Sequence, residues 1–147
     1  MSISNYDDVI DSRDVIERIE ELGEELAEKL NAVTKTDDWN SENLSEGNYQ
    51  FMVNSLPESD KDDIGEYWML VKLANEAEQY SEDWEYGESL VRYSYFEDYM
   101  DEMIEDCYEL RKDMPYWMSI KLDYEAMKQY YTSIDFDGVE YYILVNL

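Results

Sequence analysis

The spacing of apolar residues along the chain predicts three amphipathic helices. The first begins at Asp11–Ser12 and keeps its apolar stripe as far as about Val33. A second is predicted from about Lys61 to Tyr80, with an apolar face broad enough to indicate burial on more than one side or a partner surface. The third covers Tyr95–Leu110, and Pro115 ends it.

The last part of the chain changes to a β pattern. Tyr131–Phe136 and Val139–Val145 flank Asp137–Gly138, the dipeptide best suited to a two-residue type I′ turn. Val139–Val145 is apolar on both faces, which indicates an inner strand of a small sheet. A short helical piece is predicted near Asp123–Tyr130, whereas Tyr49–Val53 is ambiguous between strand and helix. The predicted fold class is α+β, mainly helical, with a small C-terminal antiparallel β-hairpin or sheet.

Length and composition favour one folded unit. The chain has 147 residues, of which 44% are hydrophobic, enough for a single acidic domain over residues 1–147. Residues 1–60 (helix plus loop) and 61–147 (helices plus hairpin) are candidate sub-lobes. No apolar run is long enough for a membrane span, and the acidic N-terminus is unlike a signal peptide. We therefore expect a cytoplasmic protein without membrane contact.

The third helix carries unbalanced charge. Its predicted inward face consists of apolar residues at positions Phe96, Tyr99, Met100, Met103, Cys107 and Leu110. Its outward face holds two neighbouring rows of carboxylates: Glu97, Asp101, Glu105 and Glu109 in one, and Asp98, Glu102 and Asp106 in the other. Like charges four residues apart repel each other in a helix. Seven carboxylates over about 24 Å match the phosphates that one DNA strand carries over the same rise, so the helix has the charge density of a nucleic acid.

The first helix supplies a second acidic patch. Its candidate residues are Glu17, Glu21 and Glu24, on a face that Arg13, Arg18 and Lys29 are expected to dilute. Over the whole chain, 38 acidic and 11 basic residues give a formal net charge of −27. Such a surface repels nucleic acid and anionic membranes and attracts basic proteins. Adaptation to high salt and a highly soluble acidic enzyme are the alternative explanations of this acidity.

The residue types present argue against most catalytic and metal chemistry. The chain has no histidine and a single cysteine, Cys107, which leaves neither the usual base of nucleophilic catalysis nor a zinc ligand set. Asp135-x-Asp137-Gly138 has only part of a calcium-loop pattern. No glycine-rich phosphate loop is present. We predict no enzyme activity, no cofactor and no metal; an enzyme that uses clustered carboxylates with Mg²⁺ or Ca²⁺ is the third hypothesis.

Aromatic residues are abundant for so acidic a chain. There are 15 Tyr, 4 Trp and 3 Phe, whereas disordered acidic tails are poor in aromatics. Most are expected in the core. Four lie in polar predicted loops and are candidate interface anchors: Trp39, Tyr49, Trp84 and Tyr86.

Short segments resemble a known family. Asp123–Ala126 (DYEA) and residues 132–142 (TSIDFDGVEYY) resemble the C-terminal end of ArdA-type antirestriction proteins and related phage proteins, and Ser94–Tyr99 (SYFEDY) is similar to a helix start in them. Val9–Ile16 (VIDSRDVI) is similar to an opening of small phage proteins. The resemblance implies an acidic, elongated, often dimeric DNA mimic that occupies the DNA groove of type I restriction enzymes. The chain departs from that family by beginning with a helix in place of a small β-containing domain.

These observations lead to one functional expectation and one alternative. We expect a DNA-mimic inhibitor that occupies the basic DNA-binding groove of a host restriction or CRISPR effector. The protein is not expected to bind nucleic acid itself. Both a monomer and a homodimer are compatible with this expectation. The alternative is an acidic adaptor or scaffold that binds a basic host protein without competing for DNA. A mimic displaces DNA from its target, whereas an adaptor forms a ternary complex.

Overall fold

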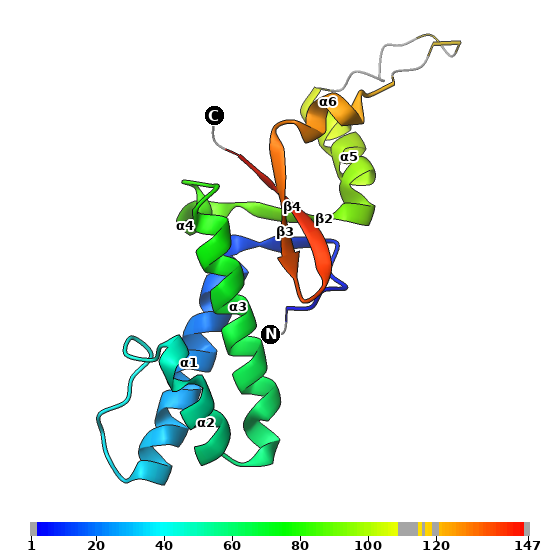
Figure 1. Ribbon diagram of the computed structural model, residues 1–147. Coiled ribbons are helices and arrows are strands. Elements are labelled where there is room, and N and C mark those ends of the chain that lie inside the picture. Colours follow the sequence, from blue (N-terminus) through cyan, green and yellow to red (C-terminus); the bar gives the residue numbers. More distant parts are fainter. Residues whose placement is uncertain (1–2, 109–114, 116, 119–120, 146–147) are drawn as a thin grey trace.

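The expected α+β, mainly helical fold is confirmed (Figure 1). The computed structural model describes residues 3–108, 115, 117–118 and 121–145, without the side chains of residues 46 and 106–108. The helices are α1 Ser12–Thr34, α2 Tyr49–Ser55, α3 Lys61–Glu78, α4 Trp84–Gly87, α5 Phe96–Tyr108 and α6 Tyr124–Lys128. The strands are β1 Val9–Asp11, β2 Ser89–Arg92, β3 Tyr131–Phe136 and β4 Val139–Leu144. Single 3₁₀ turns occupy Glu46–Asn48, Glu58–Asp60 and Tyr93–Tyr95.

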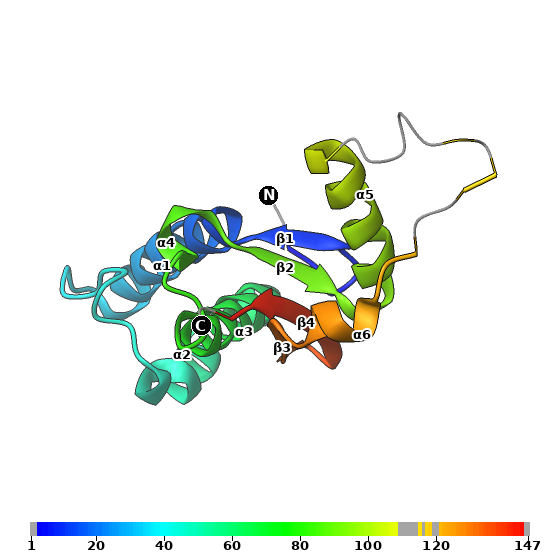
Figure 2. The same cartoon turned by 90° about the horizontal axis from the view of Figure 1, so that it is seen from above.

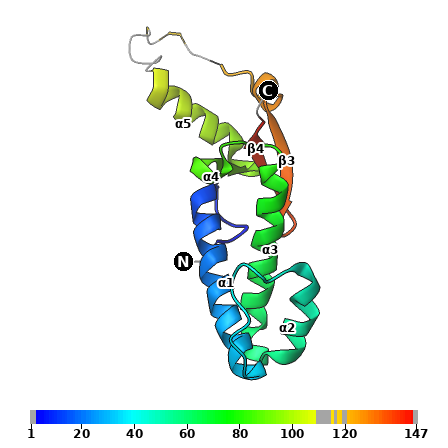
Figure 3. The ribbon, with the colours of Figure 1, turned by 90° about the vertical axis from the view of Figure 1, so that its left-hand side faces the viewer.

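Helices α1 and α3 form a long antiparallel arm that extends away from the sheet, with α2 at its far end (Figures 1 and 3). Their 23 and 18 residues correspond to about 34 and 27 Å. The side chain of Asp11 accepts a hydrogen bond from the backbone N–H of Arg13 and so caps α1, whose start the sequence predicts at Asp11–Ser12. Lys35 ends the helix in a left-handed conformation with φ of 57°.

The sheet is antiparallel throughout, with the strand order β1-β2-β4-β3. The predicted hairpin is confirmed: Phe136 pairs with Val139, and the two turn residues, Asp137 and Gly138, have positive φ values of 50° and 83°. β4 lies between β2 and β3, as its apolar pattern predicts. The sequence did not predict β1 or β2, which are three and four residues long.

Alternate residues of the strands serve two separate apolar clusters. Leu90 of β2 and Tyr141 of β4 face the larger cluster, which α1 and α3 complete with residues such as Leu26 and Leu70. Val91, next to Leu90, faces a smaller cluster with Phe96 and Met100 of α5. The sheet is therefore covered by the arm on one face and by α5 and α6 on the other (Figures 1 and 2). Both candidate sub-lobes contribute to the larger cluster.

Two short segments differ from their expectation. The ambiguous run Tyr49–Val53 belongs to helix α2. The polar segment around Trp84 and Tyr86, expected as a loop, contains the short helix α4, and β2 begins at Ser89. α4 forms because Trp84, only 1% exposed, is drawn into the larger cluster. That burial overrides the polar character of its neighbours.

Candidate functional site

Helix α5 lies over the sheet with the apolar face that its sequence predicts. Phe96 and Met100 are each 1% exposed, and Tyr99 and Met103 pack at the edge of the same cluster. Burial of this face turns most of the expected acidic residues outward. The exposed carboxylates of α5 are Glu97, Asp98, Glu102 and Glu105.

Tyrosine hydroxyls hold two of the α5 carboxylates. Tyr95 donates a hydrogen bond to both oxygens of Glu102, at 3.0 and 2.9 Å. Tyr124 of α6 donates to Asp101 at 2.7 Å, and this contact leaves Asp101 only half-exposed. A neutral phenol orients a carboxylate without cancelling its charge, whereas a lysine would cancel it. The arrangement therefore fixes negative charges in place and keeps them negative.

Tyr95 also lies near Asp8, which immediately precedes β1 and whose carbonyl accepts the backbone N–H of Arg92 at 2.8 Å. The pKa of Tyr95 is raised, first because its hydroxyl donates to Glu102, and further because Asp8 and Asp98 lie nearby. Asp8 is exposed and immediately precedes β1. Three carboxylates from two segments therefore gather around one phenol.

Not every predicted residue of this helix is placed. The side chains of Asp106 and Cys107, and Glu109 and Leu110 altogether, lie outside the described residues. The roles predicted for them stay predictions.

Helix α1 presents an acidic row that is longer than the second patch proposed from the sequence. Its exposed carboxylates are Asp14, Glu17, Glu20, Glu21, Glu24, Glu25 and Glu28. Among the described residues, only Glu21 and Glu25 of this row form ion pairs. The second patch predicted at Glu17, Glu21 and Glu24 is thus part of a larger set. Seven carboxylates over about 22 Å again approach the charge density of one DNA strand.

Arg18 of α1 contacts α3 more closely than it contacts the acidic row. Arg18 binds Glu66 of α3 through two hydrogen bonds, at 3.2 and 2.9 Å, and reaches Glu21 at 3.3 Å. Only 17% of the Arg18 side chain is exposed.

Lys29 follows the same pattern farther along the helix. Its ammonium lies 2.6 Å from Asp60 and 3.5 Å from Glu25, and the hydrogen bond to Asp60 is the main reason why the pKa of Lys29 is raised. Arg13 is held at the start of α1 by Asp11, at 2.7 Å. The expected dilution of the α1 face is therefore only partial, because Arg18 and Lys29 are directed mainly into the α1–α3 seam.

The two acidic helices lie on the same side of the molecule. In Figure 2, α1 and α5 occupy the edge opposite α2 and α3, with β1 between them, and Figure 3 shows α5 above α1 on that side. We call the exposed carboxylates described on these two helices, together with Asp8, the acidic surface: Asp8, Asp14, Glu17, Glu20, Glu21, Glu24, Glu25, Glu28, Glu97, Asp98, Glu102 and Glu105. Asp101 borders it beneath Tyr124.

Sequence reasoning missed two members of this surface, Glu20 and Asp8. Glu20 lies on the same exposed face of α1, and helical spacing alone could have included it. Asp8 joins the surface because its carbonyl accepts the backbone N–H of Arg92 at the end of β2, and the sequence gives no local signal for that contact. The roles of Tyr95 and Tyr124 depend on contacts 7 and 23 residues away along the chain.

The four candidate aromatic anchors have different environments. Tyr86 is 77% exposed and Tyr49 is 44% exposed. Trp39 is half-buried and stacks on Phe51, with ring centroids 5.7 Å apart. Trp84 is buried in the core, so the expectation that it is a surface anchor is wrong.

Two hollows flank the tip of the β3–β4 hairpin. One, of about 300 Å³, lies between the end of β2 and the hairpin, and the other, of about 270 Å³, is lined by Lys72 of α3 and by Asp135 and Asp137. The backbone N–H of Gly138 donates to Asp135 at 3.3 Å, within the turn. In the part of the chain that the structure describes, no group of three or more potential metal ligands comes together.

None of the helices in the described residues combines the length and the apolar character needed to cross a membrane. Comparison with known proteins gives no similarity on which a family could rest: no protein-family model, no curated protein and no solved structure matches the chain.

Proposed function

We propose that this protein is a DNA mimic, a non-enzymatic inhibitor that occupies the basic DNA-binding groove of a host defence nuclease complex. The observation that carries the proposal is the acidic surface, in which two helices on one side of the molecule expose carboxylates at a density close to that of DNA phosphates. The targets that we propose are restriction or CRISPR effectors in the cytoplasm of a bacterial host.

The way in which the charges are held supports this proposal. Folding alone favours carboxylates balanced by nearby lysines or arginines. Here the α1 cation Arg18 binds mainly to Glu66 of α3, Lys29 binds mainly to Asp60 just before α3, and two α5 carboxylates are oriented by phenols. Both arrangements preserve negative potential on the side that α1 and α5 share. A basic groove would be attracted to that side over about a Debye length, and the association would weaken with salt.

The sequence resemblance adds a narrower proposal. The similarity of Asp123–Ala126 and residues 132–142 to ArdA-type antirestriction proteins favours a type I restriction enzyme as the target. These residues include Tyr124 of α6, which binds Asp101, and most of the hairpin β3–β4. An anti-CRISPR role through the same mimicry is the alternative target class.

A competition experiment tests the proposal. Purified restriction and CRISPR effectors are loaded with fluorescent duplex DNA and titrated with the full chain, while DNA release is followed by anisotropy. A DNA mimic releases the DNA, and a higher salt concentration reduces its apparent affinity. Formation of a complex that contains effector, DNA and this chain together would contradict mimicry and would support the adaptor alternative.

A further inference from the structure

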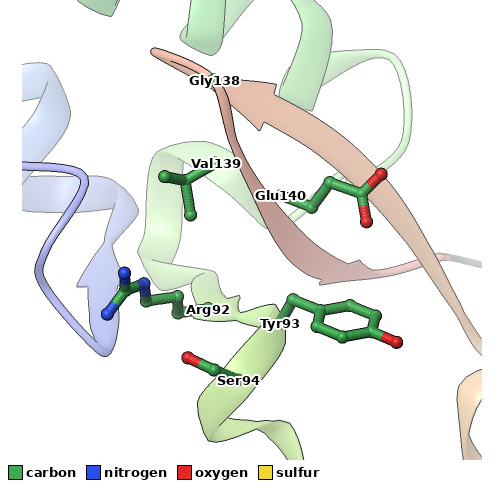
Figure 4. Close-up of a pocket in the computed structure, with 6 residues that line it drawn as sticks. All are labelled: Arg92, Tyr93, Ser94, Gly138, Val139 and Glu140. Atoms are coloured by element: carbon green, nitrogen blue, oxygen red, sulfur yellow. The ribbon is translucent and has the colours of Figure 1, made fainter.

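The hollow at the end of β2 brings a tyrosine ring and a carboxylate together outside the acidic surface. It has a volume of about 300 Å³ and is lined by Arg92, Tyr93, Ser94, Gly138, Val139 and Glu140 (Figure 4). That volume is at the small end of ligand pockets, so it suits one side chain better than a large molecule. Figure 4 shows the ring of Tyr93 and the carboxylate of Glu140 extending to the same side, whereas the guanidinium of Arg92 points away from both, toward the N-terminal segment.

The ring of Tyr93 already lies close to one cation of the protein, the ammonium of Lys128. It is 55% exposed and stacks on Tyr142, with ring centroids 5.7 Å apart. The ammonium of Lys128 lies 5.6 Å from the Tyr93 centroid and 5.9 Å from that of Phe96. This is the distance at which cations are attracted to aromatic rings. Tyr93 therefore belongs to an aromatic group that attracts cations within the protein itself.

No ion pair balances the Glu140 carboxylate among the residues that the structure describes. In the hairpin it pairs directly with Asp135, and both side chains are exposed. Like charges directly opposite each other on neighbouring strands are destabilising. Within the described residues, the side chain of Glu140 has neither a hydrogen bond nor an ion pair, whereas that of Asp135 accepts the backbone N–H of Gly138. A cation placed beside Glu140 would relieve this repulsion.

We infer that this hollow receives one arginine side chain of the protein that the acidic surface binds. The planar guanidinium stacks on Tyr93 and donates two hydrogen bonds to Glu140, a geometry that a lysine ammonium does not provide. The net charge of −27 favours a cation over an anion at this position. The inference rests on the proposed function only in requiring a basic partner, and it adds a contact that depends on shape as well as on charge.

The pocket can be tested on the protein alone, without its target. The full chain, labelled with ¹³C in its tyrosine rings, is titrated with Nα-acetyl-L-arginine amide and followed by NMR, and Tyr93→Phe identifies the Tyr93 signals. We expect saturable shifts at Tyr93. Nα-acetyl-L-citrulline amide, which has nearly the same shape without the charge, should leave them unchanged.

Two substitutions and a matched control make the test specific. Glu140→Gln and Tyr93→Leu should each weaken arginine binding at this site by about fivefold or more. Glu82→Gln removes the same charge from an exposed position in the α3–α4 connection and should leave the affinity unchanged. Thermal unfolding checks the fold, and Glu140→Gln should be at least as stable as the parent chain because it relieves the repulsion with Asp135.

The outcomes separate the pocket from the proposed function. Equal weakening by Glu140→Gln and Glu82→Gln, or equal shifts with arginine and citrulline, would overturn the pocket, whatever the DNA competition shows. Saturable arginine binding at Tyr93 that is lost in Glu140→Gln but kept in Glu82→Gln would establish the pocket. This conclusion would hold even if the chain failed to displace DNA from every effector tested.

Discussion

At the scale of single residues, the acidic surface depends on partners that leave carboxylates charged. Asp101 and Glu102 both accept hydrogen bonds from tyrosine hydroxyls, but in different surroundings. Asp101 is half-exposed beneath α6, whereas Glu102 and its bond to Tyr95 face solvent. Water can replace a lost partner at an exposed carboxylate but does so less well at a covered one. The two tyrosines therefore form a natural pair for comparison.

Tyr124→Phe should destabilise the fold, because it leaves Asp101 without its phenol donor. We expect a loss of about 1 kcal/mol in the free energy of unfolding, measured by urea denaturation. Tyr95→Phe, which removes the exposed hydroxyl, should produce no measurable loss. Equal effects of the two variants would contradict the view that the cover over Asp101 makes its hydrogen bond matter.

The stability of the fold should decrease in alkali because two tyrosine hydroxyls are shielded from solvent. Burial is the main reason why the pKa values of Tyr131 and Tyr141 are raised from 10.0 to about 12. Because the folded state binds these protons more tightly than the unfolded state, their stabilising contribution is complete below pH 10 and is lost as the pH rises toward 12. The melting temperature should fall over this interval. The fall should be shallower in the Tyr131→Phe/Tyr141→Phe double variant, and an identical fall in both proteins would contradict this cause.

At the scale of elements, the α1–α3 seam uses cations that would otherwise cover the acidic row. Asp60 is 8% exposed and has the ammonium of Lys29 at 2.6 Å. Arg13 forms a comparably short pair with Asp11, but 66% of its side chain is exposed. Removing one partner of a buried ion pair leaves an uncompensated charge, whereas an exposed pair contributes little.

Lys29→Met should therefore lower the free energy of unfolding by about 1–3 kcal/mol, because it leaves the Asp60 carboxylate without its cation. Arg13→Met removes the same charge and should leave stability nearly unchanged. Chemical denaturation of the two variants at equal salt measures the difference. Similar losses in both would show that net charge, and not the buried contact, determines the result.

The elements also show how far sequence reasoning extends. The helix of Ser12–Thr34, the apolar face of α5 and the Asp137–Gly138 turn each have a local signal, in a cap, a repeat or a dipeptide. β1 and β2 have none, because strands of three and four residues are too short to show a period. They exist because residues about 80 positions apart pair with each other.

The candidate site follows the same division. Helical spacing predicts which residues of α5 and α1 face solvent. It does not predict that Arg18 reaches across to Glu66, or that Tyr124 reaches Asp101, because both contacts depend on how separate elements pack.

At the scale of the whole molecule, like charge opposes compactness. A net charge of −27 on 147 residues, with two acidic helices on the same side, destabilises the folded state through self-repulsion. Salt screens that repulsion over a length that falls from about 30 Å at 0.01 M to about 10 Å at 0.1 M. The same screening would weaken attraction to a basic groove.

Sodium chloride should therefore stabilise the free protein while it weakens target binding. Between 0.01 and 0.5 M we expect a gain of about 1 kcal/mol or more, equivalent to a rise of about 3 °C in melting temperature for a chain of this length. Differential scanning calorimetry checks this, with an equal osmolarity of glycerol as the uncharged control. A melting temperature that does not change with salt would contradict a large self-repulsion.

The central claim is that the positions of the carboxylates on α1 and α5, beyond their number, produce the inhibition. Two variants with the same change in net charge separate position from number. The first neutralises five residues of the acidic surface with Gln or Asn: Glu17, Glu20, Glu24, Asp98 and Glu102. The second neutralises five exposed acidic residues elsewhere: Asp37, Glu42, Asp62, Glu78 and Glu82.

The decisive measurement is the concentration of each variant that releases half of the bound duplex DNA from an effector that the parent chain inhibits. We predict that the acidic-surface variant requires at least about a tenfold higher concentration than the parent chain, and the control variant less than about threefold. Equal losses in the two variants, or full activity of the acidic-surface variant, would contradict the claim.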